Sequence, residues 1–145
     1  MSHNNGRIMA VDYGDARTGV AVSDESATLA GDAWVIHNRR IDEVAQAVVT
    51  EALARGVFRI VVGYPKNMDG SIGPRAEKSE GFAESLRSLC EIEVELWDER
   101  MTTMSANRVL TEVGKFGKKR KKTIDAVAAS LILESYLVFL KGKTE

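Results

Sequence analysis

The sequence predicts an α/β protein built on one mixed sheet of five strands with helices packed against it. Three short apolar runs with turn-rich connections open the chain, and two further strand patterns then alternate with helical patterns. Strands that alternate with helices form right-handed parallel crossovers. The length of 145 residues, with 44% hydrophobic and 28% charged residues, is typical of one folded domain. We therefore expect a single domain over residues 1–145, with residues 1–6 as a disordered tail.

The first half of the chain is expected to form an antiparallel meander and a helix. Arg7–Asp12 is an apolar run that ends in an acid, and residues 19–23 and 33–37 are two further runs joined by short turns. Such connections favour antiparallel hairpins. Apolar residues then recur at helical spacing over residues 41–53, and Gly56 ends the pattern.

The second half is expected to supply two parallel strands and three helices. Residues 57–63 are a buried type of strand, followed by a Gly- and Pro-rich loop and a helix over about 75–90. Residues 92–97 alternate as a strand and end at an acidic pair. A helix over about 103–113 follows, with Thr102 or Thr103 as its N-cap, and a last helix begins at Ile124 with Thr123 as its N-cap.

Acidic residues fall at the ends of these expected elements. Asp12 ends the first strand, the pair Asp98 and Glu99 ends the fifth, and Asp125 opens the last helix. Ligands of open α/β sheets bind beyond the carboxyl ends of the strands, where these acids meet if the first, fourth and fifth strands are neighbours. Clustered carboxylates suit Mg²⁺ or Mn²⁺, and two such ions about 3.5–4 Å apart can hydrolyse a phosphodiester.

Each acid also has a structural interpretation, and one choice between neighbours stays open. Asp before a turn is common, Asp125 would complement a helix dipole, and Glu99 continues a run of surface glutamates. Asp98 and Glu99 lie on opposite faces of an alternating strand, and alternation often fails at strand ends. The longer reach of Glu99 favours it as the ligand, with Asp98 as the alternative.

The charge of the chain is unevenly distributed. Twenty Lys and Arg against 21 Asp and Glu give a formal net charge of −1, which by itself argues against a nucleic-acid partner. Six basic residues and no acid fall in residues 115–122, and the remainder of the chain carries −7. This basic segment consists of Lys115, Lys118, Lys119, Arg120, Lys121 and Lys122. We expect it to bind the phosphates of a nucleic acid, although a solvated loop is the alternative.

Two arginines near the acids are candidate phosphate ligands. Arg17 follows the turn after the first strand, and Arg100 follows Glu99 directly. An arginine can donate two parallel hydrogen bonds to a phosphate. The alternatives are an exposed hairpin residue for Arg17 and an ion pair with the neighbouring acids for Arg100.

Four separated motifs in this order resemble one known family. They are D-Y-G-x-x-R-x-G-V-A-V-S-D at 12–24, V-V-G-Y-P-x-N-M-D-G-S at 61–71, D-E-R-M-T-T at 98–103 and I-D-A-V-A-A at 124–129. Together they resemble the YqgF/RuvX family of bacterial pre-16S ribosomal RNA nucleases, also described as Holliday-junction resolvases. The resemblance spans residues 7–140. It implies an RNase H-like fold and a divalent-metal nuclease of the bacterial cytoplasm, with Asp12, Glu99 and Asp125 as its acidic centre.

We therefore expect a metal-dependent nuclease that acts on structured RNA, first of all in 5′-end maturation of pre-16S ribosomal RNA. A resolvase that cuts four-way DNA junctions is the alternative within the same chemistry, and a non-catalytic RNA-binding ribosome-assembly factor is another. Expected partners are ribosomal precursor particles and a second copy in a homodimer, but no membrane. A nucleotide-handling domain of the actin and sugar-kinase type is disfavoured, because those proteins need two such domains.

Overall fold

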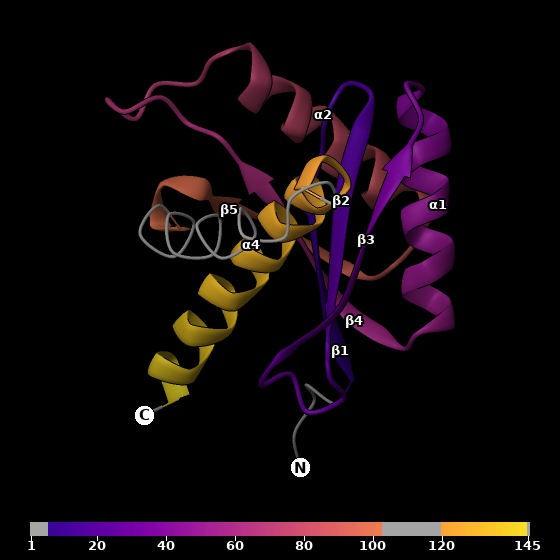
Figure 1. Cartoon of the computed structure of the whole chain (residues 1–145), viewed down its shortest axis with the longest axis vertical. Coiled ribbons are helices and arrows are strands. Elements are labelled where there is room, and N and C mark those ends of the chain that lie inside the picture. Colours follow the sequence, from indigo (N-terminus) through magenta and orange to yellow (C-terminus); the bar gives the residue numbers. More distant parts are fainter. Residues whose placement is uncertain (1–5, 103–119, 145) are drawn as a thin grey trace.

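The computed structural model describes residues 6–102 and 120–144. Three strands come first along the chain, and helices then alternate with two further strands, as the sequence predicts (Figure 1). The elements are β1 (Arg7–Asp12), β2 (Arg17–Ser23), β3 (Ala30–His37), α1 (Ile41–Ala54), β4 (Val57–Tyr64), α2 (Pro74–Leu89), β5 (Glu93–Asp98), the short 3₁₀ helix η1 (Glu99–Thr102) and α4 (Arg120–Thr144).

The five strands form one mixed sheet in the order β3-β2-β1-β4-β5. β1 pairs antiparallel with β2, and β2 pairs antiparallel with β3. β4 lies parallel to both β1 and β5. The predicted α/β fold class and its arrangement of strands are confirmed, and β1, β4 and β5 do end at one common edge.

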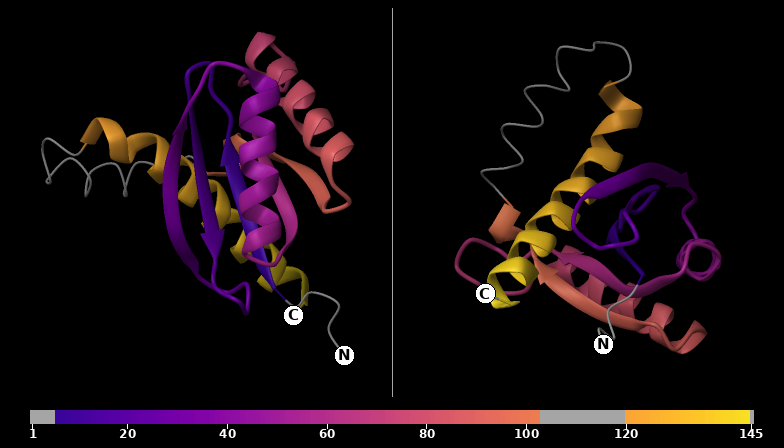
Figure 2. Two further views of the ribbon diagram at one scale, coloured as in Figure 1. Left: turned by 90° about the vertical axis from the view of Figure 1, so that its right-hand side faces the viewer. Right: turned by 90° about the horizontal axis from the view of Figure 1, so that it is seen from below.

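Helices cover both faces of the sheet, and alternation along β1 divides its side chains between them. Met9 and Val11 belong to the core that α1 and α2 cover, whereas Ile8 and Ala10 belong to the core under α4. Figure 2 shows α4 on one side of the sheet and α1 with α2 on the other. A strand buried on both faces needs apolar residues at successive positions, as β1 has.

Two strands begin earlier than their apolar runs indicate. β2 begins at Arg17, which pairs with His37 in the ladder, and β3 begins at Ala30, which pairs with Ser23. Hydrogen bonding between the antiparallel backbones continues through polar and small residues that hydropathy does not mark. Helix α2 begins at Pro74, whose fixed φ and missing N–H suit the first helical position.

The start of the last helix was predicted wrongly. Helix α4 begins at Arg120 and not at Ile124, so Thr123 lies inside the helix and is not its N-cap. Arg, Lys and Thr in this stretch include strong helix formers and no helix breaker, so the helical backbone extends into the basic segment. Arg120, Lys121 and Lys122 therefore open α4. Residues 1–5 of the tail expected over 1–6, the helix expected over 103–113 and the basic residues Lys115, Lys118 and Lys119 lie outside the described residues.

Within the described residues, no helix combines the length and the apolar character needed to cross a membrane.

Candidate active site

Asp12 and Glu99 lie at the carboxyl edge of the parallel strands and on the same face of the sheet. Asp12 is the last residue of β1 and follows the alternation of Ala10, which faces α4. Glu99 comes directly after β5 and follows the alternation of Trp97, which also faces α4. The structure thus brings these two predicted acids together beneath α4.

Glycines flank Asp12 on both sides within the sheet. Gly19 of β2 is its direct antiparallel partner. Gly63 of β4 follows Val62, the partner of Val11, so it is the next position in the parallel register. A Cβ atom at Gly63 would lie 2.5 Å from Oε2 of Glu99, so the missing side chain provides the space that this carboxylate occupies. Sequence reasoning missed Gly63, because a glycine within a strand run looks only like a weak strand position.

The missing side chain of Gly19 likewise leaves space for the backbone of Asp125. A Cβ atom at Gly19 would lie 1.9 Å from the backbone oxygen of Asp125 and 2.7 Å from its carbonyl carbon. The first turns of α4 therefore pack directly on the β2 backbone, opposite Asp12. This close approach brings the third predicted acid, Asp125, to the same edge of the sheet.

The environment raises the pKa values of both sheet-edge acids. Burial raises the pKa of Asp12 to about 6, and the charge of Asp125 adds to this increase while Arg75 opposes it. Burial likewise raises the pKa of Glu99 to about 7, with Asp12 and Asp98 adding to the increase and Arg75 opposing it. Carboxylates that repel one another in a poorly solvated place are neutralised either by protons or by a cation.

The donor set fits a hard divalent cation, although the described side chains do not yet surround one. Asp12 and Glu99 supply carboxylate oxygens, which Mg²⁺ and Mn²⁺ prefer. Among residues 6–102 and 120–144, however, no three Asp, Glu, His or Cys side chains converge closely enough to hold a metal ion. Asp125 is instead engaged by Arg17, whose Nε lies 3.3 Å from its Oδ2.

Asp98 and Arg100 form an ion pair with each other. The Arg100 side chain donates to both carboxylate oxygens of Asp98, and its backbone N–H donates to Oδ1 at 3.0 Å. These bonds hold the pKa of Asp98 below its usual range, with the Arg100 side-chain hydrogen bond as the largest cause. The side chains of Asp98 and Glu99 therefore have different surroundings: Glu99 faces Asp12, whereas Asp98 accepts hydrogen bonds from Arg100.

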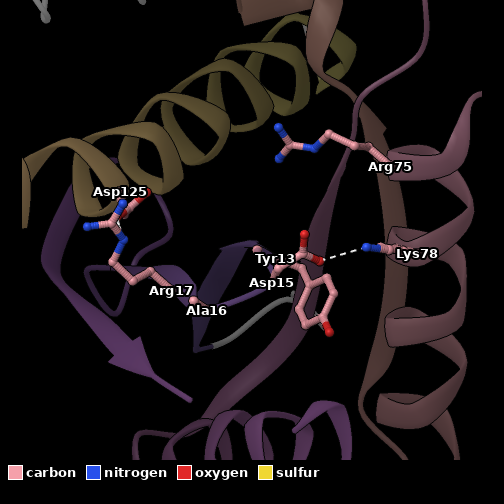
Figure 3. Close-up of a pocket in the computed structure, with 8 residues that line it drawn as sticks. Tyr13, Asp15, Ala16, Arg17, Arg75, Lys78 and Asp125 are labelled. Atoms are coloured by element: carbon pink, nitrogen blue, oxygen red, sulfur yellow. Dashed lines mark hydrogen bonds and ion pairs between the residues drawn. The ribbon is translucent and has the colours of Figure 1, made fainter. Parts of the chain in front are cut away.

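A pocket of about 260 Å³ lies beside the acids, between α2 and the turn that follows β1. Figure 3 shows Arg17 and Asp125 on one wall and Arg75 and Lys78 of α2 on the other. Lys78 Nζ lies 2.8 Å from Oδ1 of Asp15. Sequence reasoning missed Arg75 and Lys78. Their one signal is their position in the first turns of a helix that follows a loop at the functional edge.

The raised pKa values predict how the stability of the metal-free protein depends on pH. The folded state keeps the protons of Asp12 and Glu99 at pH values where the unfolded chain has lost them, so their contribution to the free energy of unfolding is full below about pH 4. It is lost as pH rises through about 6 and 7. We expect the free energy of unfolding of Glu99→Gln, relative to that of wild type, to rise by about 1–3 kcal/mol as the pH increases from 4 to 8.

Urea unfolding in EDTA across this pH range measures the difference. Asp12→Asn should give a gain of the same sign, centred about one pH unit lower, because the pKa of Asp12 in the folded protein is about 6 and that of Glu99 is about 7. A difference between Glu99→Gln and wild type that stays constant with pH would contradict the pKa assignment.

The fold of the described residues is the RNase H-like fold, which the chain shares with the RuvC resolvases. The structure is similar to Thermus thermophilus RuvC in complex with a Holliday junction substrate, with a TM-score of 0.67 and 14% identity over 95% of this chain and 97% of that one. It is also similar to the fowlpox virus resolvase in complex with Holliday junction DNA, with a TM-score of 0.59 and 14% identity over 92% and 98% of the two chains. At this identity the likeness establishes the fold alone.

Within this fold class the chain belongs to the RuvX family. The family model, described as a Holliday junction resolvase, matches residues 6–138. A relative from Halothermothrix orenii is 47% identical, covering 90% of this chain and 94% of its own. Another, from Geobacillus kaustophilus, is 46% identical over 90% and 96% of the two chains. Both carry the name "Putative pre-16S rRNA nuclease". The resemblance found in the four sequence motifs is confirmed.

Proposed function

We propose that this protein is a metal-dependent nuclease that hydrolyses phosphodiester bonds in structured RNA, with 5′-end maturation of pre-16S ribosomal RNA as its reaction. The observation that carries the proposal is the pair Asp12 and Glu99, whose pKa values are raised at the carboxyl edge of β1 and β5. The names of the relatives supply the substrate. The whole chain, residues 1–145, acts as one RNase H-like domain in this proposal.

Asp12 and Glu99 would hold Mg²⁺ or Mn²⁺, and Asp125 would complete the site once its carboxylate leaves Arg17. Two bound ions would supply an activated water and stabilisation of the leaving oxygen. The protein itself contributes rigid placement, because Asp12 is fixed by the sheet and Asp125 by the packing of α4 on Gly19. Burial of the two sheet-edge carboxylates strengthens their attraction for a cation.

The cationic residues would hold the substrate. Arg17 lies beside Asp125, and Arg120, Lys121 and Lys122 open α4 within five residues of it. Lys115, Lys118 and Lys119 extend this charge in sequence. Arg100 is the exception, because it pairs with Asp98 and so would steady the site without contacting substrate. In this proposal the protein works in the bacterial cytoplasm on ribosomal precursor particles.

Cleavage of four-way DNA junctions is the second candidate. The description of the family model and the fold shared with RuvC favour it. Paired cuts across a junction need two centres in one assembly, so this candidate requires a homodimer. The metal centre would be the same for both substrates.

Cleavage assays with purified protein separate the candidates. We expect Mg²⁺- or Mn²⁺-dependent cutting of a pre-16S RNA fragment, no cutting in EDTA and much slower cutting of a four-way DNA junction. Faster cutting of the junction by a dimer would establish the resolvase instead. RNA binding with no cleavage under any metal would overturn the nuclease and support an assembly factor.

Two neighbouring variants test which acid serves the centre. Glu99→Gln should lower the cleavage rate by a factor on the order of 10³, because it removes a carboxylate that faces Asp12. Asp98→Asn should lower it less than about ten-fold, since Asp98 pairs with Arg100 and contributes indirectly. Single-turnover rates at saturating metal measure both. Equal losses, or a larger loss for Asp98→Asn, would assign the ligand role to Asp98.

A further inference from the structure

The side chains that line the pocket beside the acids include more cations than carboxylates, and the proposed metal site does not use these cations as ligands. Three cationic side chains line it, Arg17, Arg75 and Lys78, against two carboxylates, Asp15 and Asp125. Its volume of about 260 Å³ is below the roughly 300–1,000 Å³ of sites for drug-sized ligands. A compact anionic group therefore suits it better than a large heterocycle.

The Arg75 side chain points into open space beside the acids, where it is available to bind a ligand. Its charge lowers the pKa values of Asp12, Asp15 and Glu99. Yet among the described residues it makes no ion pair within 4.0 Å, whereas Arg17 and Lys78 each make one. Figure 3 shows its side chain directed into the space between α2 and α4.

The two ion pairs in the pocket can be exchanged at little cost. The side chains of Lys78 and Asp15 are 56% and 71% exposed, and in the second pair the side chains of Arg17 and Asp125 are 54% and 26% exposed. An exposed pair such as that of Lys78 and Asp15 contributes little to stability, and Arg17 keeps more than half of its side chain in solvent. A phosphate can therefore recruit Lys78 and Arg17 without a large loss of folding free energy.

The floor of the pocket is firmly held. Tyr13, which follows Asp12 directly, stacks on Phe82 of α2 with ring centroids 4.5 Å apart and an interplanar angle of 16°. The backbone N–H of Gly14 donates to Oγ1 of Thr18 at 3.3 Å, which closes the turn. A group bound here would lie next to Asp12 at a fixed distance from it.

We propose that Arg75 and Lys78, together with Arg17, bind a phosphate of the substrate strand next to the phosphate that is cleaved. This inference rests on the proposed nuclease function, because it uses the position of the pocket relative to Asp12. The bound phosphate fixes the strand relative to the acids. Arg75 forms the forked contact, and Lys78 leaves Asp15 to reach the same group.

Binding of a short single-stranded RNA, followed by fluorescence anisotropy without added divalent ion, tests the proposal. We expect Arg75→Gln to weaken binding about ten-fold and to reduce the slope of log K against log salt by about 1. Arg87→Gln is the matched control, because it removes the same charge from the same helix roughly 18 Å further along. It should change the dissociation constant less than about two-fold, with thermal melting used to verify folding of both variants.

Two forms of the RNA distinguish the sources of the phosphate. An equal effect of Arg75→Gln on 5′-phosphorylated and 5′-hydroxyl RNA assigns an internal phosphate to the pocket, and an effect confined to the phosphorylated form assigns a terminal one. Equal affinities and salt slopes for Arg75→Gln and Arg87→Gln would overturn the proposal. Because this assay measures binding, the two proposals fail separately. If Arg75→Gln weakens RNA binding but the wild-type protein never cleaves RNA, the nuclease function alone is overturned. If the wild-type protein cleaves RNA but Arg75→Gln binds it as tightly as wild type does, this phosphate site alone is overturned.

Discussion

Replacing Asp12 by Asn should abolish cleavage while leaving the fold intact. We expect the single-turnover rate to fall by a factor on the order of 10³ or more, equivalent to about 4 kcal/mol of transition-state stabilisation. Asn preserves the shape of the side chain but removes the negative charge that would hold a divalent cation. Cleavage of the pre-16S RNA fragment in Mg²⁺ or Mn²⁺ measures the loss.

The same substitution should not destabilise the metal-free protein at neutral pH. Ionised Asp12 is penalised by burial and by the charge of Asp125, which is why its pKa is raised to about 6. Removing that charge relieves the penalty, so the free energy of unfolding in EDTA at neutral pH should be higher than that of wild type. Loss of activity with retained stability is typical of a residue kept for function.

Asp32→Asn provides the matched control. Asp32 lies in the first half of β3, its side chain is 78% exposed, and it pairs with Arg55. We expect its cleavage rate to stay within about two-fold of wild type, because surface pairs contribute little. Retained cleavage by Asp12→Asn would disprove the metal-nuclease assignment of this acid.

Gly19→Ala should destabilise the protein strongly and also reduce cleavage. The added Cβ would lie 1.9 Å from the backbone oxygen of Asp125, so helix α4 must move away from β2. Helix α4 carries much of one core, including Leu133 and Tyr136, so this movement loosens packing across that face. We expect a loss of about 3 kcal/mol in the free energy of unfolding, at the upper end for overpacked sites.

Gly81→Ala is the control for this substitution. Gly81 lies within α2, and a Cβ atom there would meet nothing within 4 Å. Alanine in an exposed helix interior should stabilise the protein by about 0.5–1 kcal/mol. Urea unfolding of both variants measures the pair. A Gly19→Ala protein as stable as wild type would show that α4 does not rest on β2 as described.

The sequence was sufficient to predict which segments form strands and in what order they follow one another along the chain, because hydropathy follows burial. The run Arg7–Asp12 is apolar at successive positions since both faces of β1 are covered, and the acid that ends it marks the sheet edge. The start of α4 was missed for a physical reason. Lys and Arg are good helix formers, so a basic run does not by itself indicate a loop.

The candidate site could be predicted only in part. Alternation along β5 already distinguished the faces of Asp98 and Glu99, but the value of that pattern depended on which face α4 covers. Arg75 and Lys78 could not be assigned, because their proximity to the turn after β1 comes from the crossover between β4 and β5 and not from spacing in the chain. Gly63 became informative only when Glu99 was seen to occupy the space above it.

The most direct measurement of the central claim is a crystal structure of the protein with Mn²⁺, read by anomalous scattering. We predict a peak in contact with carboxylate oxygens of Asp12 and Glu99, at roughly the 2.0–2.2 Å typical of hard divalent ions of this size. Asp125 should then have left Arg17 to approach the same position. A peak held elsewhere, or none at this edge when Mn²⁺ supports cleavage, would contradict the proposed metal centre.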